Sequence, residues 1–336
     1  MSNDSSCSAR PADQKTGGQA VIEGVMMKSP VATAVAVRTR DGRILGKTLE
    51  MKQLRDRGPL WGKPVFRGAA ILIDTLRLGM KALNWSAEVA EEAEAEAAGR
   101  SGKKRQGGGL GTTALAFLMA IVLFAWLPLQ ASRWMISDTT HPSAQFGLHL
   151  LAGFFRIAAF LIYLLAISLM KEVRRLFMYH GAEHQTIHAW EAGLEPLIDR
   201  AVEQSPLHQR CGTSFLLLVM LGTVIFYGVF DSLVVLFFGF SPSAVVRVLY
   251  HLPLIPLVMG LSYEILKLAD SHLETSALAR AVTYPGLMLQ KLTTRKAGRD
   301  EVEVAVASLR ISLGIDPGMP VEMVRDGEAG EGGVTE

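Results

Sequence analysis

The sequence predicts a mainly helical, polytopic membrane protein: a four-span helical bundle with a small N-terminal β-element and cytoplasmic helices. Hydrophobic residues make up 49% of the 336 residues, and the mean hydropathy of +0.27 is high for a water-soluble protein. This apolar excess is concentrated in four segments that are long enough to cross a hydrocarbon core of about 30 Å. The formal net charge is only +2, so no strong field indicates a nucleic-acid partner.

The four expected spans differ from the buried helices of a soluble protein because apolar residues occupy every face of the helix. The second span is interrupted only by Arg156. We expect the spans at residues 112–136, 146–170, 213–238 and 246–268, in contact with membrane lipid.

Basic residues predict the orientation of these spans. The loop between the first two spans carries only Arg133, and the loop between the last two carries only Arg247. The opposite side is richer in basic residues, namely Lys103, Lys104, Arg105, Lys171, Arg174, Arg175, Lys267, Arg280, Lys291 and Arg295. By the positive-inside rule, both termini are cytoplasmic. The outer loops are too short to form a domain, so an active site would lie in the membrane or on the cytoplasmic side.

Polar and glycine-rich segments divide the rest of the chain. Asp41-Gly42 lies between two β-prone segments and predicts a hairpin. An amphipathic helix over residues 66–86 is expected to pack on this hairpin or to lie at the membrane surface. A further helix is expected to continue the second span and to end at Gly193. The predicted order is a disordered tail at 1–16, the hairpin and helix at 17–98, a linker at 99–111, the membrane domain at 112–268 with its cytoplasmic loop 171–212, a C-terminal cytoplasmic helical segment at 269–322, and a disordered tail at 323–336.

The best candidate for chemistry is His180-Gly-Ala-Glu-His184, just after the second span. Positions four apart share a helix face, so both imidazoles can reach one ion. Glu183 can then act as the general base on a metal-bound water, in the inverted order of the zincin helix. The alternative is a polar juxtamembrane helix whose histidines lie at the headgroup level.

A catalytic zinc ion normally takes three protein ligands, so a further ligand is needed. Glu264 lies near the cytoplasmic end of the fourth span, and His208 and Cys211 directly precede the third span, at the same membrane level. The alternatives are that Glu264 pairs with Lys267 or Arg210, and that Cys211 is a small buried residue. The only other cysteine, Cys7, is distant in sequence, so a reducing compartment is the simpler interpretation.

Three further residues are candidates for contact with a substrate or with the ligands. Arg210 can hold an anionic substrate group. His188 continues the helical stripe of His180 and His184, either as a partner of the ligands or simply exposed. Glu23 lies within the glycine-punctuated segment 17–27, which predicts a loop that covers the site or, alternatively, an ordinary turn and edge strand.

The sequence resembles the YqhQ-like family of bacterial multi-pass membrane proteins, which are regarded as predicted metal-dependent enzymes of uncharacterised function. The matching stretches are GGQAVIEGVMM at 17–27, the RG…LGMKALNWSA pattern at 67–87, YHGAEHQTI at 179–187, HQRCGTSF at 208–215 and YPGLMLQKLTTR at 284–295 with the following EVEVAVASL. One departure is Gln209, where the family pattern has proline. The resemblance implies that His180, Glu183, His184, His208 and Cys211 belong to the shared core. It implies no particular reaction.

These observations favour a metal-dependent hydrolase, with zinc as the expected ion, at the cytoplasmic face of the bacterial inner membrane. Its substrate would be a membrane protein, a peptide or a lipid-linked molecule. The alternative is a non-enzymatic membrane scaffold, or a factor for the assembly or quality control of other membrane proteins. Transport is less favoured, because the spans contain few ionisable residues, namely Arg156, Asp231 and Glu264. The sequence is also compatible with a homo-oligomer.

Overall fold

The computed structural model describes residues 16–97 and 110–324, apart from residues 196, 210, 242 and 274. Of the predicted terminal tails and the linker at 99–111, only residues 16, 110–111 and 323–324 lie within the described chain. Helices dominate the described chain, and four of them, counting α2 and α3 as one span, are long and apolar enough to cross a membrane. The prediction of a mainly helical polytopic protein with a small N-terminal sheet is confirmed.

The N-terminal strands form an antiparallel meander in the order β1-β2-β3-β4, and a short C-terminal strand, β5, pairs parallel to β4. The predicted hairpin around Asp41-Gly42 joins β3 to β4, and Gly42 has the positive φ of 90° that this turn requires. Segment 17–27 also forms a hairpin, the first along the chain, with Glu23 in its turn at φ 53°. The strands are β1 (Gly17–Val21), β2 (Gly24–Lys28), β3 (Thr33–Arg38), β4 (Ile44–Thr48) and β5 (Glu322–Met323).

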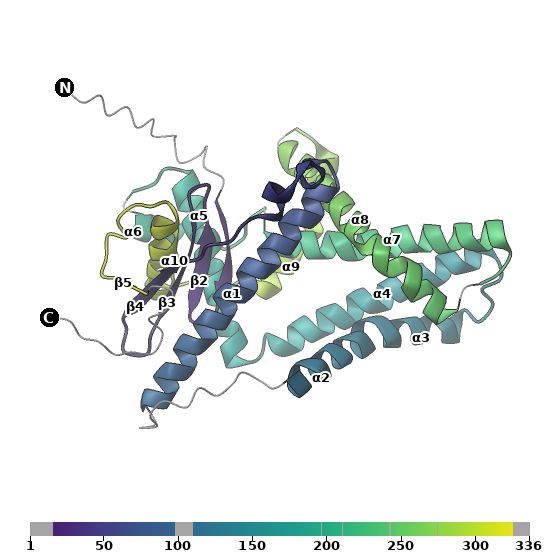
Figure 1. The fold of residues 1–336 in the computed structure, drawn as a ribbon, viewed down its shortest axis with the longest axis horizontal. Coiled ribbons are helices and arrows are strands. Elements are labelled where there is room, and N and C mark those ends of the chain that lie inside the picture. The colour runs from purple at the N-terminus through teal and green to yellow at the C-terminus, as the bar shows by residue number, and fades with distance from the viewer. Residues whose placement is uncertain are drawn as a thin grey trace.

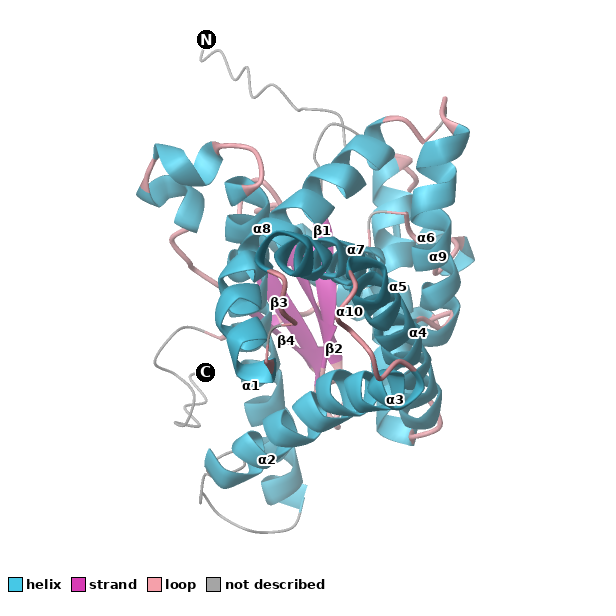
Figure 2. Cartoon of the chain, turned by 90° about the vertical axis from the view of Figure 1, so that its right-hand side faces the viewer, coloured by secondary structure: helices cyan, strands magenta, loops and turns pink. Residues whose placement is uncertain are grey.

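Helices cover both faces of this sheet. Residues such as Met26 and Val35 pack on one face against Leu78 and Trp85 of α1. The opposite face, which includes Met27, packs against α5 and α10, and α6 packs on these two helices. Figure 2, which looks along the membrane helices, shows the strands between α1 on one side and α5 with α10 on the other. These helices are α1 (Phe66–Ala97), α5 (Lys171–Glu191), α6 (Leu197–Glu203) and α10 (Arg299–Ser312). We call the sheet with these four helices the sheet domain.

The remaining long helices form the membrane bundle, which extends away from the sheet domain (Figure 1). The first span consists of α2 (Leu110–Ile121), a π-helical segment (Val122–Trp126) and α3 (Leu127–Met135). Pro128, four residues after Phe124, has no N–H to donate to the Phe124 carbonyl. This carbonyl instead accepts a hydrogen bond of 2.8 Å from Nε of Arg156, the basic residue of the second span. The other helices are α4 (Pro142–Ile167), α7 (Gly212–Phe238), α8 (Ala244–Ser271) and α9 (Ala277–Thr293). Each of the four predicted spans thus corresponds to a helical segment that is long and apolar enough to cross a membrane, although the second runs over Pro142–Ile167 instead of 146–170.

One expectation is wrong: α5 does not continue the second span. Helix α4 ends at Ile167, and Met170 takes an extended conformation before α5 begins at Lys171. The Ser168 hydroxyl donates to the Leu165 carbonyl and so satisfies one backbone group at the break. The break frees α5 to turn out of the bundle and to pack on the sheet.

Two contacts near the start of α1 attach this helix to the bundle. Arg67, at the start of α1, makes a two-point ion pair with Glu264 of α8, with N···O distances of 2.7 and 2.6 Å. Beside it, α1 and α8 cross at Gly68 and Gly260. A Cβ on Gly68 would meet Tyr263 and the Gly260 backbone of α8, and a Cβ on Gly260 would meet the backbone of Val65, just before α1. Helix α1 is thus anchored at the membrane end of the sheet domain.

Gly181 is the point where α5 comes closest to the chain between α9 and α10. A Cβ at this position would lie 1.8 Å from the Arg295 carbonyl oxygen. We therefore expect Gly181→Ala to lower the free energy of unfolding by about 1–3 kcal/mol, because backbone would have to move. Thermal unfolding of the chain in lipid nanodiscs measures this effect.

Gly147→Ala in α4 is the matched control. Its new Cβ would meet only Ile136 Cδ1, at an ordinary 3.7 Å. Equal melting temperatures for the two variants would contradict the close approach at Gly181.

Candidate metal centre

His180 and His184 point from α5 toward Cys211, the residue that precedes α7. His180 Nε2 lies 3.3 Å from Cys211 Sγ, and the His184 side chain also hydrogen-bonds this sulfur. The three ligand atoms all lie within 4.8 Å of one another. His184 and Cys211 are buried and His180 is half-buried. The structure therefore brings together three of the predicted site residues.

Backbone carbonyls fix the tautomers of both imidazoles. His180 Nδ1 donates to the Thr293 carbonyl at 2.8 Å, and His184 Nδ1 donates to the Pro206 carbonyl at 2.6 Å. A carbonyl can only accept, so the proton of each neutral ring resides on Nδ1 and the Nε2 lone pair faces the sulfur. Histidine ligands of metal ions are commonly oriented in this way. Sequence reasoning could not identify Thr293 and Pro206, because they act through their backbone.

The third donor, Cys211, is the N-cap of α7 and has an extended backbone. Its sulfur also lies 3.3 Å from the Thr213 hydroxyl oxygen. A cysteine binds a metal ion as the thiolate. Two imidazoles and one thiolate fit a zinc ion with three protein ligands and one open position.

Glu183 faces the sheet from the same turn of α5. It is buried, the backbone N–H of Gly18 in β1 donates to its carboxylate, and a side chain on Gly18 would collide with it. Burial raises the pKa of Glu183 to about 7, an effect that His180 and the Gly18 hydrogen bond only partly offset. Segment 17–27 is thus a hairpin whose first strand contacts this carboxylate.

Burial also favours the form of His184 that can bind a metal. Desolvation lowers the pKa of His184, against the opposing effect of the Cys211 hydrogen bond. The ring is therefore neutral at physiological pH and keeps its lone pair on Nε2.

His188 and His208 lie beside the three donors and are not among them. The His208 ring is 5.6 Å from that of His184 and 4.7 Å from that of His188, between ring centroids. His188 Nε2 donates to the Leu207 carbonyl at 2.8 Å, and His208 Nε2 is 3.8 Å from a carboxylate oxygen of Glu191. Sequence reasoning missed Glu191, although it follows His180, His184 and His188 on one face of α5.

The remaining predicted site residues lie elsewhere. Glu264, which we expected to approach the histidines, is held by Arg67 instead. Glu23, at the tip of the first hairpin, pairs with Arg175 at 2.5 Å. Arg210 lies outside the described residues.

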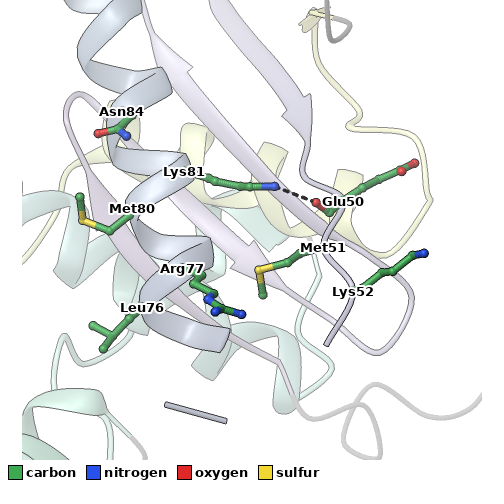
Figure 3. Close-up of a pocket in the computed structure, with 8 residues that line it drawn as sticks. All are labelled: Glu50, Met51, Lys52, Leu76, Arg77, Met80, Lys81 and Asn84. Atoms are coloured by element: carbon green, nitrogen blue, oxygen red, sulfur yellow. Dashed lines mark hydrogen bonds between the residues drawn. The ribbon is translucent and has the colours of Figure 1, made fainter. Parts of the chain in front are cut away.

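A groove of about 610 Å³ lies on α1, away from these histidines. Figure 3 shows it between α1 and the chain after β4, with Lys81 donating to the Glu50 carbonyl at 3.2 Å. Its lining is basic and apolar and contains none of the predicted site residues, being formed by Glu50, Met51, Lys52, Leu76, Arg77, Met80, Lys81 and Asn84.

Comparisons with known proteins agree on one family. A family model described as "Protein of unknown function (DUF1385)" matches residues 63–314, which include both histidines, Glu183 and Cys211. The uncharacterized protein YqhQ of Bacillus subtilis (strain 168) is 32% identical over 312 residues, which cover 89% of this chain and 92% of that protein. No solved structure matches.

The raised pKa of Glu183 predicts a specific dependence of stability on pH. Because the pKa rises from 4.5 to about 7 on folding, the contribution of Glu183 to stability is complete below about pH 4.5. It is then lost as the pH rises through about 7, which costs about 3 kcal/mol for the metal-free protein.

Unfolding of the wild type and of Glu183→Gln, in chelator and over this pH range, tests the prediction. Glutamine cannot ionise, so the difference in stability between the two proteins should change with pH in this window. A constant difference would show that Glu183 keeps an ordinary pKa.

Proposed function

Because the chain belongs to the DUF1385 family, whose function is not assigned, we propose a function from its own residues: a metal-dependent hydrolase, with zinc as the ion. The observation that carries the proposal is the convergence of His180 Nε2, His184 Nε2 and Cys211 Sγ, with both Nδ1 atoms committed to carbonyls. Donors oriented in this way suit an ion better than a plain hydrogen-bond network, since the lone pairs face one another across a small space.

The role of Glu183 follows from its protonation. A carboxyl group with a pKa of about 7 accepts and returns a proton readily near neutral pH, as a general base and acid must. The bound ion would supply Lewis-acid polarisation and would make a water easier to deprotonate. Glu183 would take the proton at its carboxylate, and the Gly18 N–H would hold this carboxylate in place.

The position of the site suggests the class of substrate. Cys211 is the N-cap of the apolar helix α7, and the histidines lie in the sheet domain, so the donors lie where the bundle meets the sheet domain. The basic residues Lys171, Arg174 and Arg175 at this end suggest that it is cytoplasmic. A membrane protein, a peptide or a lipid-linked molecule at the cytoplasmic face of the bacterial inner membrane is the substrate that we propose.

A second candidate function is a membrane scaffold or assembly factor with a structural metal. The helices that supply the ligand atoms support this candidate, because an ion bound to α5 and to the start of α7 would link the sheet domain to the bundle. On this view Glu183 has no chemical role.

Metal content tests the shared premise of both candidates. We expect close to one zinc or other transition-metal ion per chain, measured by elemental mass spectrometry after purification in mild detergent without chelator or histidine tag. The His180→Ala/His184→Ala double variant should lose it, whereas His272→Gln, at an exposed histidine outside the site, should keep it. A folded wild type that holds no metal, even after metal is added back, would rule out the metal centre.

Glu183→Gln separates the two candidates. For a hydrolase, cleavage of a peptide library by the wild type should fall by about 10²–10⁴-fold in the variant, with metal content unchanged. Equal cleavage by both proteins would exclude Glu183 as the base. Absence of cleavage by a metal-loaded wild type would favour the scaffold.

A further inference from the structure

A second polar cluster surrounds Asp231 at the other end of the bundle. Asp231, on α7, is fully buried. Tyr250 donates to its Oδ1 at 2.5 Å, and His251 Nε2 lies 2.9 Å from the same atom. His149 Nε2 lies 2.7 Å from Oδ2, and Arg247 Nε lies 3.3 Å from it. Three helices, α4, α7 and α8, therefore converge on one carboxylate.

Further contacts hold this cluster in place. Arg247 Nη2 donates to Gln145 Oε1 at 2.9 Å, and the Tyr227 hydroxyl donates to the His251 carbonyl at 2.9 Å. The Tyr227 ring stacks on the His251 ring at 4.0 Å between centroids. Ionisable side chains within spans are costly, and they commonly mark ion or proton pathways.

The carboxylate of Asp231 favours a proton on an adjacent imidazole, because it lies 2.7 Å from His149 Nε2 and 2.9 Å from His251 Nε2. Arg247, which pairs with Asp231, and Arg133 of α3, which lies within electrostatic range of Arg247, are both positive and oppose the uptake of a second proton. Neutral imidazoles at positions 149 and 251 donate through Nε2 to the carboxylate, so each ring keeps Nδ1 as a site for a proton. The two rings lie 6.1 Å apart between centroids, so a proton on one opposes a proton on the other.

A metal ion fits this cluster less well than a proton does. Each imidazole contacts a different oxygen of Asp231, as in ordinary hydrogen bonds, and the cationic Arg247 contacts the same carboxylate. The imidazoles are also the exposed part of the cluster, with 14% and 17% of their side-chain surface accessible against 0% for Asp231. The histidines are therefore the accessible part of the cluster, whereas Asp231 is enclosed.

We propose that His149, Asp231 and His251 form a proton-binding site that takes up one proton, shared between the two imidazoles, from the aqueous side opposite the metal centre. Asp231 is the fixed counter-charge, and Arg247 and Tyr250 hold its carboxylate. Asp231 lies 20 positions after Cys211 along α7, or about 30 Å for a helix. The site is therefore separate from the metal centre, and its test does not depend on the proposed hydrolase.

Nuclear magnetic resonance of histidine-labelled full-length chain in lipid nanodiscs tests this proposal. Single histidine substitutions, including His272→Gln, assign the signals. Between pH 8 and pH 5, where imidazoles commonly change charge, we expect the signals of His149 and His251 to shift together. Their summed change should correspond to about one proton.

Asp231→Asn should abolish this coupled titration. Tyr250→Phe serves as the test if Asp231→Asn does not fold. It removes one donor to the Asp231 carboxylate and keeps the ring, so it should alter the pH midpoint of the coupled titration. The proposal is overturned if neither histidine changes charge in this range, if each takes up a full proton independently, or if the titration is the same in the folded variants as in the wild type.

Discussion

Two buried glutamines hold the loops on which the metal centre depends. Gln290 of α9 accepts from the His208 N–H and donates to the His208 carbonyl, both at 2.8 Å. Gln185 of α5 donates to the Ala201 and Val202 carbonyls at 3.1 Å and accepts from the Ala297 N–H at 2.9 Å. A primary amide offers donors and an acceptor without charge, so it can bond backbone N–H and C=O groups at helix ends and in loops at the same time. The Pro206 carbonyl and Cys211, which orient and complete the donor set, lie in the loop that these bonds fix.

Much of the architecture could be predicted from local patterns. The spans are continuous apolar runs, Asp41-Gly42 has the chemistry of its turn, and four-residue spacing places His180 and His184 on one face of a helix. The first hairpin was harder to predict, because a strand buried on both faces lacks polar alternation. The choice among Cys211, His208 and Glu264 depended on contacts distant in sequence. Glu264 is paired with Arg67, 197 positions away, and no local pattern could indicate this.

Two charged side chains within the spans have partners inside the bundle. Arg156 donates to the Phe124 carbonyl, and Asp231 is surrounded by donors from α4 and α8. In a hydrocarbon environment such groups need internal partners, because no water is present to replace them. Helix α7 links the two polar ends, since it starts at Cys211 and carries Asp231 beyond an apolar stretch.

The sheet domain is built from segments that the membrane spans separate in the sequence, and this has a consequence for biogenesis. Ser308 of α10 donates to the Ala34 carbonyl, 274 positions earlier in the chain, and α10 covers strands that leave the ribosome before it. All four spans are synthesised between these two segments. Until α10 emerges, the apolar face of the sheet that includes Val25, Met27 and Ala36 lacks this cover. A chain that stalls during membrane insertion therefore displays this face to chaperones and proteases, whereas a completed chain conceals it.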